Sequence, residues 1–215
     1  MLQVNKNTTI LILAPHTDDG EFGCGGSIAK FIRLGARVIY VAFSAAEQSV
    51  PKHLPKDILR KEVLSATKIL GIKKQDCIVL NFEVRRFPEF RQQILDEMIK
   101  INSKFKPNLV FLPSTNDTHQ DHMTIANEGF RAFKRTSILA YEVPWNNPKF
   151  CASTFIPLSK KDLSKKIKSV SKYNSQKHRD YASDEYVKSL AITRGVQVGF
   201  ELAEAFEIVR MFNDQ

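Results

Sequence analysis

Two short segments of this 215-residue chain combine histidine and aspartate at spacings that suit a catalytic metal site. Residues 16–19 read His-Thr-Asp-Asp, and residues 119–122 read His-Gln-Asp-His. Imidazole nitrogens and carboxylate oxygens are common ligands of a catalytic zinc ion, which keeps one position open for water. A carboxylate that is not a ligand could serve as the general base. The residue types therefore indicate metal-assisted hydrolysis.

Each segment directly follows an apolar run that is typical of a buried strand. These runs are residues 9–14 and residues 109–112. Along the chain, strand-like runs alternate with amphipathic helical patterns. This alternation predicts an α/β, Rossmann-like fold, in which a mostly parallel sheet carries helices on both faces. Because ligands of such sheets bind beyond the carboxyl ends of the strands, both segments are expected at the same edge.

The same patterns predict where each strand and helix lies. Strands are expected at residues 9–14, 37–43, 77–80, 109–112, 137–141, 150–156 and 205–211. Helices are expected at residues 26–34, 56–70, 88–105, 122–133, 158–173 and 186–192. Gly35 and Gly71 follow two of these helices and are suitable C-terminal stops. The length and the absence of a clear linker predict a single domain over residues 1–215.

The composition narrows the class of protein. The formal net charge of +9 and the pI near 9.5 would suit a nucleic-acid partner. However, much of the excess positive charge lies in the lysine-rich residues 159–177. We interpret these lysines as a solvated helix face, and the main alternative is that the positive charge serves an anionic substrate. Three widely spaced cysteines argue against a disulfide framework and for a reducing compartment. Without a secretion signal or an apolar run of membrane-spanning length, the chain is expected to be cytoplasmic.

Spacing alone does not decide which groups would hold the metal. His16 and Asp19 belong to the first segment, and His119 and His122 share one face if a helix starts between them. Catalytic zinc commonly takes three protein ligands, so one of these four groups is in excess. Without a metal, the first segment would be a polar turn that caps a helix, and the second would hold solvated histidines. Their shared position after two strands favours a metal site.

With their neighbours, the two segments resemble the LmbE/PIG-L family of zinc-dependent N-acetylglucosamine deacetylases. The first motif runs from Pro15 through Gly-Cys-Gly-Gly at residues 23–26, and the second reads Asp117-x-His-Gln-Asp-His. Supporting similarities lie at residues 60–62, 70–72, 106–110, 173–181, 194–195 and 203–207. The commonest form of the first motif is His-Pro-Asp-Asp-Glu. This chain instead has Thr17 and Gly20, with Glu21 one place later.

The resemblance implies a role for each motif residue. The implied ligands of zinc, or of another divalent transition metal, are His16, Asp19 and His122. Asp18 would be the general base, and protonated His119 would stabilise the oxyanion, with Asp121 as the neighbour of His119. The implied substrate contacts are Arg60, Arg86, Trp145, Arg179 and Arg194. The family also assembles into oligomers, so a homo-oligomer fits the resemblance.

The implied activity is removal of the acetyl group from an N-acetylated amino sugar or its conjugate, by a water that the metal and Asp18 activate. The partner would be that small sugar, and no nucleic acid is expected. One alternative is a metal-dependent phosphoesterase, although two-metal sites need more carboxylates than these strand ends supply. The other is a non-catalytic module that binds a sugar nucleotide on the same kind of sheet.

Overall fold

The central strands form from continuous apolar runs in the computed structural model, which describes residues 4–212. In β1 (Thr9–Ala14), five of the six residues are buried. β2 (Arg37–Ala42), β4 (Leu109–Pro113) and β5 (Ser137–Tyr141) are buried to a similar degree. Parallel strands that are covered on both faces carry such runs, because each side chain meets a hydrophobic layer.

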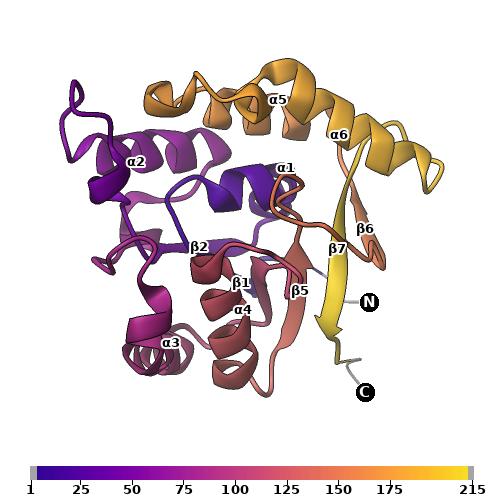
Figure 1. Cartoon of the computed structure of the whole chain (residues 1–215). Helices are drawn as coiled ribbons and strands as arrows, with labels where there is room; N and C mark the ends of the chain where they lie inside the picture. Colours follow the sequence, from indigo (N-terminus) through magenta and orange to yellow (C-terminus); the bar gives the residue numbers. More distant parts are fainter. Residues whose placement is uncertain (1–3, 213–215) are drawn as a thin grey trace.

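Seven strands form one mostly parallel sheet, which confirms the predicted α/β fold (Figure 1). The strand order is β3-β2-β1-β4-β5-β7-β6. The remaining strands are β3 (Cys77–Val79), β6 (Thr154–Pro157) and β7 (Ala203–Arg210). The pairs among β1 to β5 are parallel, whereas β7 lies antiparallel between β5 and β6. The sheet therefore takes strands from both halves of the chain.

Helices cover both faces of this sheet (Figure 1). They are α1 (Asp19–Arg33), α2 (Ile58–Leu70), α3 (Arg91–Phe105), α4 (Gln120–Ala132), α5 (Lys160–Val170) and α6 (Asp184–Val196). α1 and α2 belong to one hydrophobic core, and α3 and α4 belong to the core on the opposite face. α5 packs across α1 and α2, and α6 packs against β7. Within residues 4–212, none of the helices combines the length and the apolar character that crossing a membrane requires.

The sheet changes its direction of growth between β1 and β4. These strands are parallel neighbours, with Ile10 opposite Leu109 and Ile12 opposite Phe111. The chain leaves β1 into α1 on one face and leaves β4 towards α4 on the other face. Such a switch point opens a crevice at the carboxyl edge, which is the edge where the parallel strands end. Both His/Asp segments emerge there.

The first helix begins earlier than the sequence predicted. α1 starts at Asp19 rather than at residue 26, so the glycine-rich stretch is helical. The helix is kinked at Cys24, whose φ of −146° is not helical. Beyond the kink, the Glu204 carboxylate accepts hydrogen bonds from the backbone N–H groups of Gly26 (3.0 Å) and Ser27 (2.6 Å). A side chain from β7 thus replaces helical partners that the kink removes.

Two of these glycines bring α1 unusually close to the sheet. A Cβ atom at Gly20 would lie 2.5 Å from the ring of Tyr40, and one at Gly23 would lie 2.2 Å from the ring of Tyr141. Only glycine allows this approach without displacing a sheet tyrosine. The other predicted boundaries differ from the structure by no more than four residues. For example, α4 begins at Gln120 rather than at residue 122, β6 begins at Thr154 rather than at residue 150, and α6 ends at Val196 rather than at residue 192.

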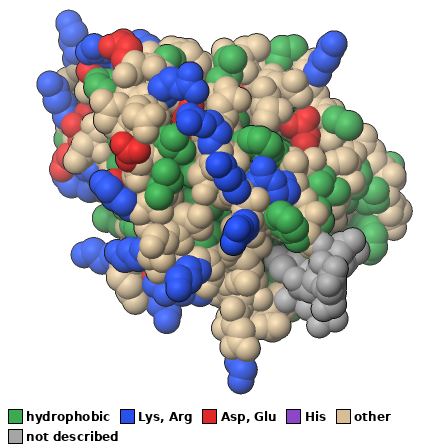
Figure 2. All heavy atoms as spheres, turned by 90° about the horizontal axis from the view of Figure 1, so that it is seen from below, with side chains coloured by type: hydrophobic (Ala, Val, Ile, Leu, Met, Phe, Trp, Pro, Cys, Tyr) green, Lys and Arg blue, Asp and Glu red, His purple; other side chains and the backbone are tan. Residues whose placement is uncertain are grey.

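Exposed basic side chains gather where the parallel strands begin, at what we call the amino edge. They precede β1, β3, β4 and β5, and they are Lys6, Lys73, Lys74, Lys104, Lys106, Lys134 and Arg135. Within residues 4–212, none of them forms an ion pair with a carboxylate. Seen from below, on the side of the α4–β5 connection, the surface shows many basic side chains and few acidic ones (Figure 2).

Candidate active site

Three side chains from the two His/Asp segments converge at the carboxyl edge. His16 lies in the turn after β1, Asp19 is the first residue of α1, and His122 lies in the first turn of α4. Oδ2 of Asp19 is 3.2 Å from Nδ1 of His16 and 3.3 Å from Nε2 of His122. The two imidazole ring centroids are 5.3 Å apart. Residues that are remote in the sequence thus meet at one carboxylate oxygen.

These distances suit a tetrahedral metal ion. Nitrogen and oxygen ligands about 2.0–2.2 Å from zinc, at tetrahedral angles, lie about 3.4 Å from one another. The distances from the Asp19 oxygen to the His16 nitrogen and to the His122 nitrogen are close to this value. His119 offers a fourth donor, since ligand atoms of His16, His119 and His122 all lie within 4.8 Å of one another. The donor set therefore fits a divalent transition metal.

Two further carboxylates contact the imidazole nitrogens that are not paired with Asp19. Nε2 of His16 is 2.9 Å from Oδ2 of Asp121, and Nδ1 of His122 is 2.8 Å from Oδ2 of Asp117. Such partners fix the orientation of a ligating ring and make its other nitrogen a better donor. The resemblance placed Asp121 beside His119. In the structure the Asp121 carboxylate contacts His16 instead, and only its backbone N–H reaches His119.

The cluster stabilises positive charge. Burial alone would lower the pKa of His16, but the negative charges of Asp19 and Asp121 raise it to about 9. For His122, burial is likewise outweighed by Asp19 and Asp117, and its pKa rises to about 10. Burial would raise the pKa of Asp19, yet the two imidazoles hold it well below its usual range. A cation, whether a proton or a metal ion, is therefore favoured between these groups.

His119 differs from the other two histidines in its hydrogen bonding. Its Nδ1 accepts a hydrogen bond from the backbone N–H of Asp121 at 3.1 Å, as the N-cap of α4. Burial and then the charge of His16 lower the pKa of His119. Both observations favour a neutral ring that carries its proton on Nε2, whereas the resemblance implied a protonated ring. His119 can still donate one hydrogen bond into the cavity that it borders.

Asp18 lies beside the cluster and borders an open cavity of about 310 Å³. Its neighbour Asp19 turns towards the imidazoles, so the two adjacent carboxylates have different surroundings. Burial, and then the negative charge of Asp19, raise the pKa of Asp18 to about 6. A carboxylate that faces a cavity, next to a cation site, has the position that a general base needs.

An aromatic wall closes one side of the cavity. Trp145, in the connection after β5, stacks on Tyr181 with ring centroids 3.7 Å apart and an interplanar angle of 8°. Phe22 of α1 packs edge-on against both rings. The guanidinium of Arg179 lies 5.9 Å from the centroid of the Tyr181 ring. The structure therefore brings two of the five predicted substrate residues, Trp145 and Arg179, to the cavity.

The other three predicted substrate residues do not border this cavity. Arg60 pairs with Glu47 at 2.7 Å, Arg194 pairs with Glu142, and exposed Arg86 pairs with two glutamates of its own loop. Arg85, the neighbour of Arg86, borders the cavity instead. The choice between these adjacent arginines depends on backbone conformation, which the sequence does not display.

A buried polar cluster supports the first His/Asp segment from within the protein. The hydroxyls of Tyr40 and Tyr173 lie within hydrogen-bonding distance of both the Thr17 carbonyl oxygen and the Glu21 carboxylate. Burial raises the pKa of Glu21 to about 8. In the sequence, Glu21 stands out only as a departure from the commonest motif. The motif gives no sign of two tyrosine partners on distant elements.

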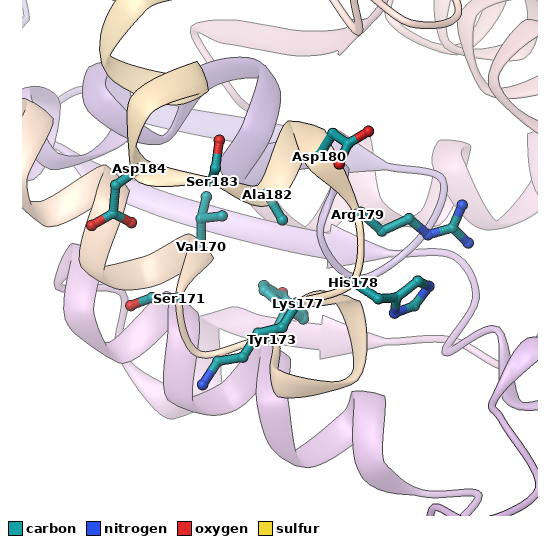
Figure 3. Close-up of a pocket in the computed structure, with 10 residues that line it drawn as sticks. All are labelled: Val170, Ser171, Tyr173, Lys177, His178, Arg179, Asp180, Ala182, Ser183 and Asp184. Atoms are coloured by element: carbon teal, nitrogen blue, oxygen red, sulfur yellow. The ribbon is translucent and has the colours of Figure 1, made fainter.

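Residues 170–184 form a second hollow of about 330 Å³ next to the site (Figure 3). Arg179 lines both hollows, and in Figure 3 its side chain extends away from Ser171 and Asp184. Tyr173, which also lines the second hollow, contacts the first His/Asp segment through its hydroxyl. The segment between α5 and α6 therefore contributes both to the rim and to the support of the site.

Comparison with known proteins assigns the family. The model of the PIG-L family, described as GlcNAc-PI de-N-acetylase, matches residues 11–133, which is more than half of the chain. The matched range includes both His/Asp segments, β4 and most of β1. The chain belongs to this family, which confirms the resemblance.

Named relatives include deacetylases. The chain is 28% identical over 177 residues to YaiS of Escherichia coli, an uncharacterised deacetylase by name, covering 80% of this chain and 93% of that protein. It is 24% identical over 234 residues to the diacetylchitobiose deacetylase of Thermococcus kodakarensis, covering 95% of this chain and 84% of that protein. Both similarities extend over most of each protein.

Solved structures with the same fold include deacetylases and a hydratase. The 4-carboxy-2-hydroxymuconate hydratase of Pseudomonas putida is 19% identical, with a TM-score of 0.76, covering 97% of this chain and 98% of that chain. A shared fold at such low identity does not define the reaction, so the assignment of an activity depends on the site itself.

Proposed function

We propose that this protein is a metal-dependent hydrolase that removes the acetyl group from an N-acetylated amino sugar or its conjugate. The observation that carries the proposal is that Oδ2 of Asp19 lies within 3.3 Å of ring nitrogens of both His16 and His122, next to Asp18, which borders the cavity. Membership of the PIG-L family and the names of its relatives support the substrate class.

In this proposal His16, Asp19 and His122 hold the metal, for which zinc is the first candidate. A bound divalent ion would polarise the amide carbonyl and lower the pKa of a water. Asp117 and Asp121 keep the two rings in the orientation that presents a free nitrogen to the ion. Because Asp117 and Asp121 are both engaged with imidazole rings, neither of them is available as the general base.

Asp18 supplies the proton transfers. Its carboxylate accepts a proton from the water that attacks the acetamide carbon, and it then delivers that proton to the departing amine. His119 donates its Nε2–H towards the oxygen on which negative charge develops. The products are acetate and the free amino sugar, and the protein returns to its starting protonation state.

The aromatic wall would position the sugar. The stacked rings of Trp145 and Tyr181 contribute apolar surface to the cavity beside the proposed catalytic groups. Sugar rings bind against such surfaces through their apolar faces, while their hydroxyls find polar partners. Gln176 and Asn146 border the same cavity and can serve as those partners. This arrangement favours a substrate with at least one sugar ring next to the acetamide.

The test is acetate release from N-acetylglucosamine and its simple glycosides by purified protein, before and after the metal is removed with a chelator. We expect activity to disappear on chelation and to return when a divalent transition metal is added back. Phosphate release from phosphorylated sugars without any acetate would favour the phosphoesterase alternative. Tight binding of a sugar nucleotide without turnover of any sugar would favour the binding module.

A further inference from the structure

A buried ion pair is inserted at the kink of α1. In a regular helix, the carbonyl oxygen of Phe22 would accept a hydrogen bond from the backbone N–H of Gly26. In this structure, the Phe22 carbonyl accepts a hydrogen bond from Nζ of Lys166 at 2.6 Å. The N–H of Gly26 donates to Oε1 of Glu204 at 3.0 Å. The two charged side chains therefore take the places of the donor and the acceptor of one helical hydrogen bond.

The pair connects α1 to two elements from the second half of the chain. Lys166 lies on α5 and Glu204 on β7, and Nζ of Lys166 is 2.6 Å from Oε1 of Glu204. Each residue is only 5% exposed, although burying two charges carries a large desolvation cost. Replacing such a pair by well-packed apolar residues often leaves stability unchanged or increases it. The pair is therefore better explained by the backbone geometry that it imposes than by stability.

The turn of α1 that precedes the kink carries the proposed catalytic residues. Asp19 begins this turn, and Asp18 immediately precedes it. The N–H of Phe22 donates to the carbonyl oxygen of Asp18 at 3.1 Å, and the carbonyl oxygen of the same Phe22 accepts from Lys166. Phe22 thus connects the buried lysine to the backbone of the proposed general base.

Phe22 is also part of the aromatic wall. Its ring lies edge-on to the rings of Trp145 and Tyr181, with centroid distances of 5.3 and 5.5 Å, and all three residues border the cavity. Edge-to-face contacts depend on the relative orientation of the rings. A rotation of the first turn of α1 would therefore change the aromatic wall and the position of Asp18 together.

Resting on the proposed deacetylase function, we propose that Lys166 and Glu204 are positioning residues, which together set the orientation of the first turn of α1. Among the residues that the structure describes, neither belongs to the lining of the cavity, so they act through Phe22. Its backbone transmits the constraint to Asp18, and its ring transmits it to the aromatic wall. A displacement of about 1 Å at a catalytic group can cost about 10²-fold in rate.

The test is a double variant, Lys166→Met with Glu204→Gln, which removes the ion pair without leaving an unpaired charge in the interior. With metal loaded, kcat for acetate release from the methyl glycoside of N-acetylglucosamine should fall by about 10- to 100-fold. Metal content should be unchanged, because the Asp19 carboxylate is also held by the backbone N–H of His16 at 2.7 Å. A general loosening of the protein would instead reduce metal content and kcat together.

Two further variants complete the series. Arg33→Gln is the matched control, because it breaks another ion pair between α1 and α5, with Asp162 at 2.9 Å, beyond the kink. Its kcat should stay within about twofold of that of the unmodified protein. Glu204→Gln alone is a smaller change, and it carries the test if the double variant does not fold. Circular dichroism and melting curves verify that each variant is folded.

Fluorescence tests the aromatic wall without any substrate. Trp145 is the only tryptophan of the chain, so its emission reports on this wall alone. In the double variant, displacement of Phe22 should shift the emission to longer wavelength and increase quenching by acrylamide, because more of the indole would meet water. Arg33→Gln should retain the emission of the unmodified protein.

The outcomes separate the inference from the function on which it rests. In a folded, metal-loaded variant of the pair, an undiminished kcat would overturn the positioning of Asp18, and unchanged emission would overturn that of Phe22. No acetate from the unmodified protein with metal bound would overturn the deacetylase alone, since the fluorescence comparison would still test whether the pair orients the turn.

Discussion

The carboxyl edge and the amino edge of the same sheet carry opposite kinds of polar group. At the carboxyl edge, close contacts between carboxylate oxygens and imidazole nitrogens link His16, Asp19, Asp121 and His122, and the last three are buried. At the amino edge, lysines and one arginine are exposed and have no carboxylate partner among residues 4–212. The net charge of +9 therefore does not indicate which residues could take part in catalysis. The proposed reactive groups of this protein lie at the edge away from the basic surface.

The largest expected effect comes from removing a proposed metal ligand at the carboxyl edge. In His122→Ala, metal content should fall to background and acetate release should become undetectable, because His122 is one of the three proposed ligands. Elemental mass spectrometry gives the metal per chain. His53→Ala, which changes an exposed histidine, is the matched control. A full complement of metal in His122→Ala would remove this residue from the ligand set.

A change at Asp18 should separate proton transfer from metal binding. Asp18→Asn keeps the size of the side chain but removes the base, so kcat should fall by about 10²- to 10⁴-fold. The metal content should remain that of the unmodified protein. Asp57→Asn, at an exposed aspartate paired with Lys61, serves as the control. Undiminished kcat in Asp18→Asn with metal bound would assign the proton transfers to another group.

A change behind the site should weaken the metal without removing a ligand. Asp117→Asn loses the negative charge that contacts Nδ1 of His122 at 2.8 Å. Loss of such a partner typically weakens metal affinity by about 10- to 100-fold. Competition with a chromogenic chelator measures the dissociation constant, with Asp96→Asn on α3 as the control. Unchanged affinity would show that the His122 ring is held in place without this carboxylate.

The smallest effect is expected at the amino edge. Lys104→Gln together with Lys134→Gln should change kcat/KM by less than about twofold and the free energy of unfolding by no more than about 0.5 kcal/mol per site, as for ordinary surface changes. Acetate release and urea unfolding provide the two values. A tenfold loss of activity would contradict the comparison, because it would connect the basic edge to catalysis.

The strands and the two His/Asp segments could be predicted because their patterns are local. Residues 9–14 and 137–141 are strands as the apolar runs indicated. The start of α1 could not be predicted in this way. Glycine has a low helix propensity, and here the helix is maintained by Tyr40, Tyr141 and Glu204, which lie far away in the sequence.

The site shows the same division between local and distant information. A general rule about parallel sheets sufficed to predict that His16 and His122 would meet, and they do. Two details of the site were not predicted. One is the 2.8 Å contact between Asp117 and His122, and the other is the positive φ of Arg85, which borders the cavity where Arg86 was expected. These details are set by the folded backbone, so motif spacing alone cannot supply them.

The close approach of Gly20 and Gly23 to the sheet tyrosines has a consequence for how this protein could acquire new substrates. The start of α1 packs against the sheet without space for a side chain at these positions, so an added methyl group at either glycine would push on Tyr40 or Tyr141. The cavity wall, by contrast, includes side chains outside the long helices and strands, at Arg85, Trp145, Arg179 and Tyr181. Specificity can therefore diversify in these loops while the proposed catalytic groups stay constant.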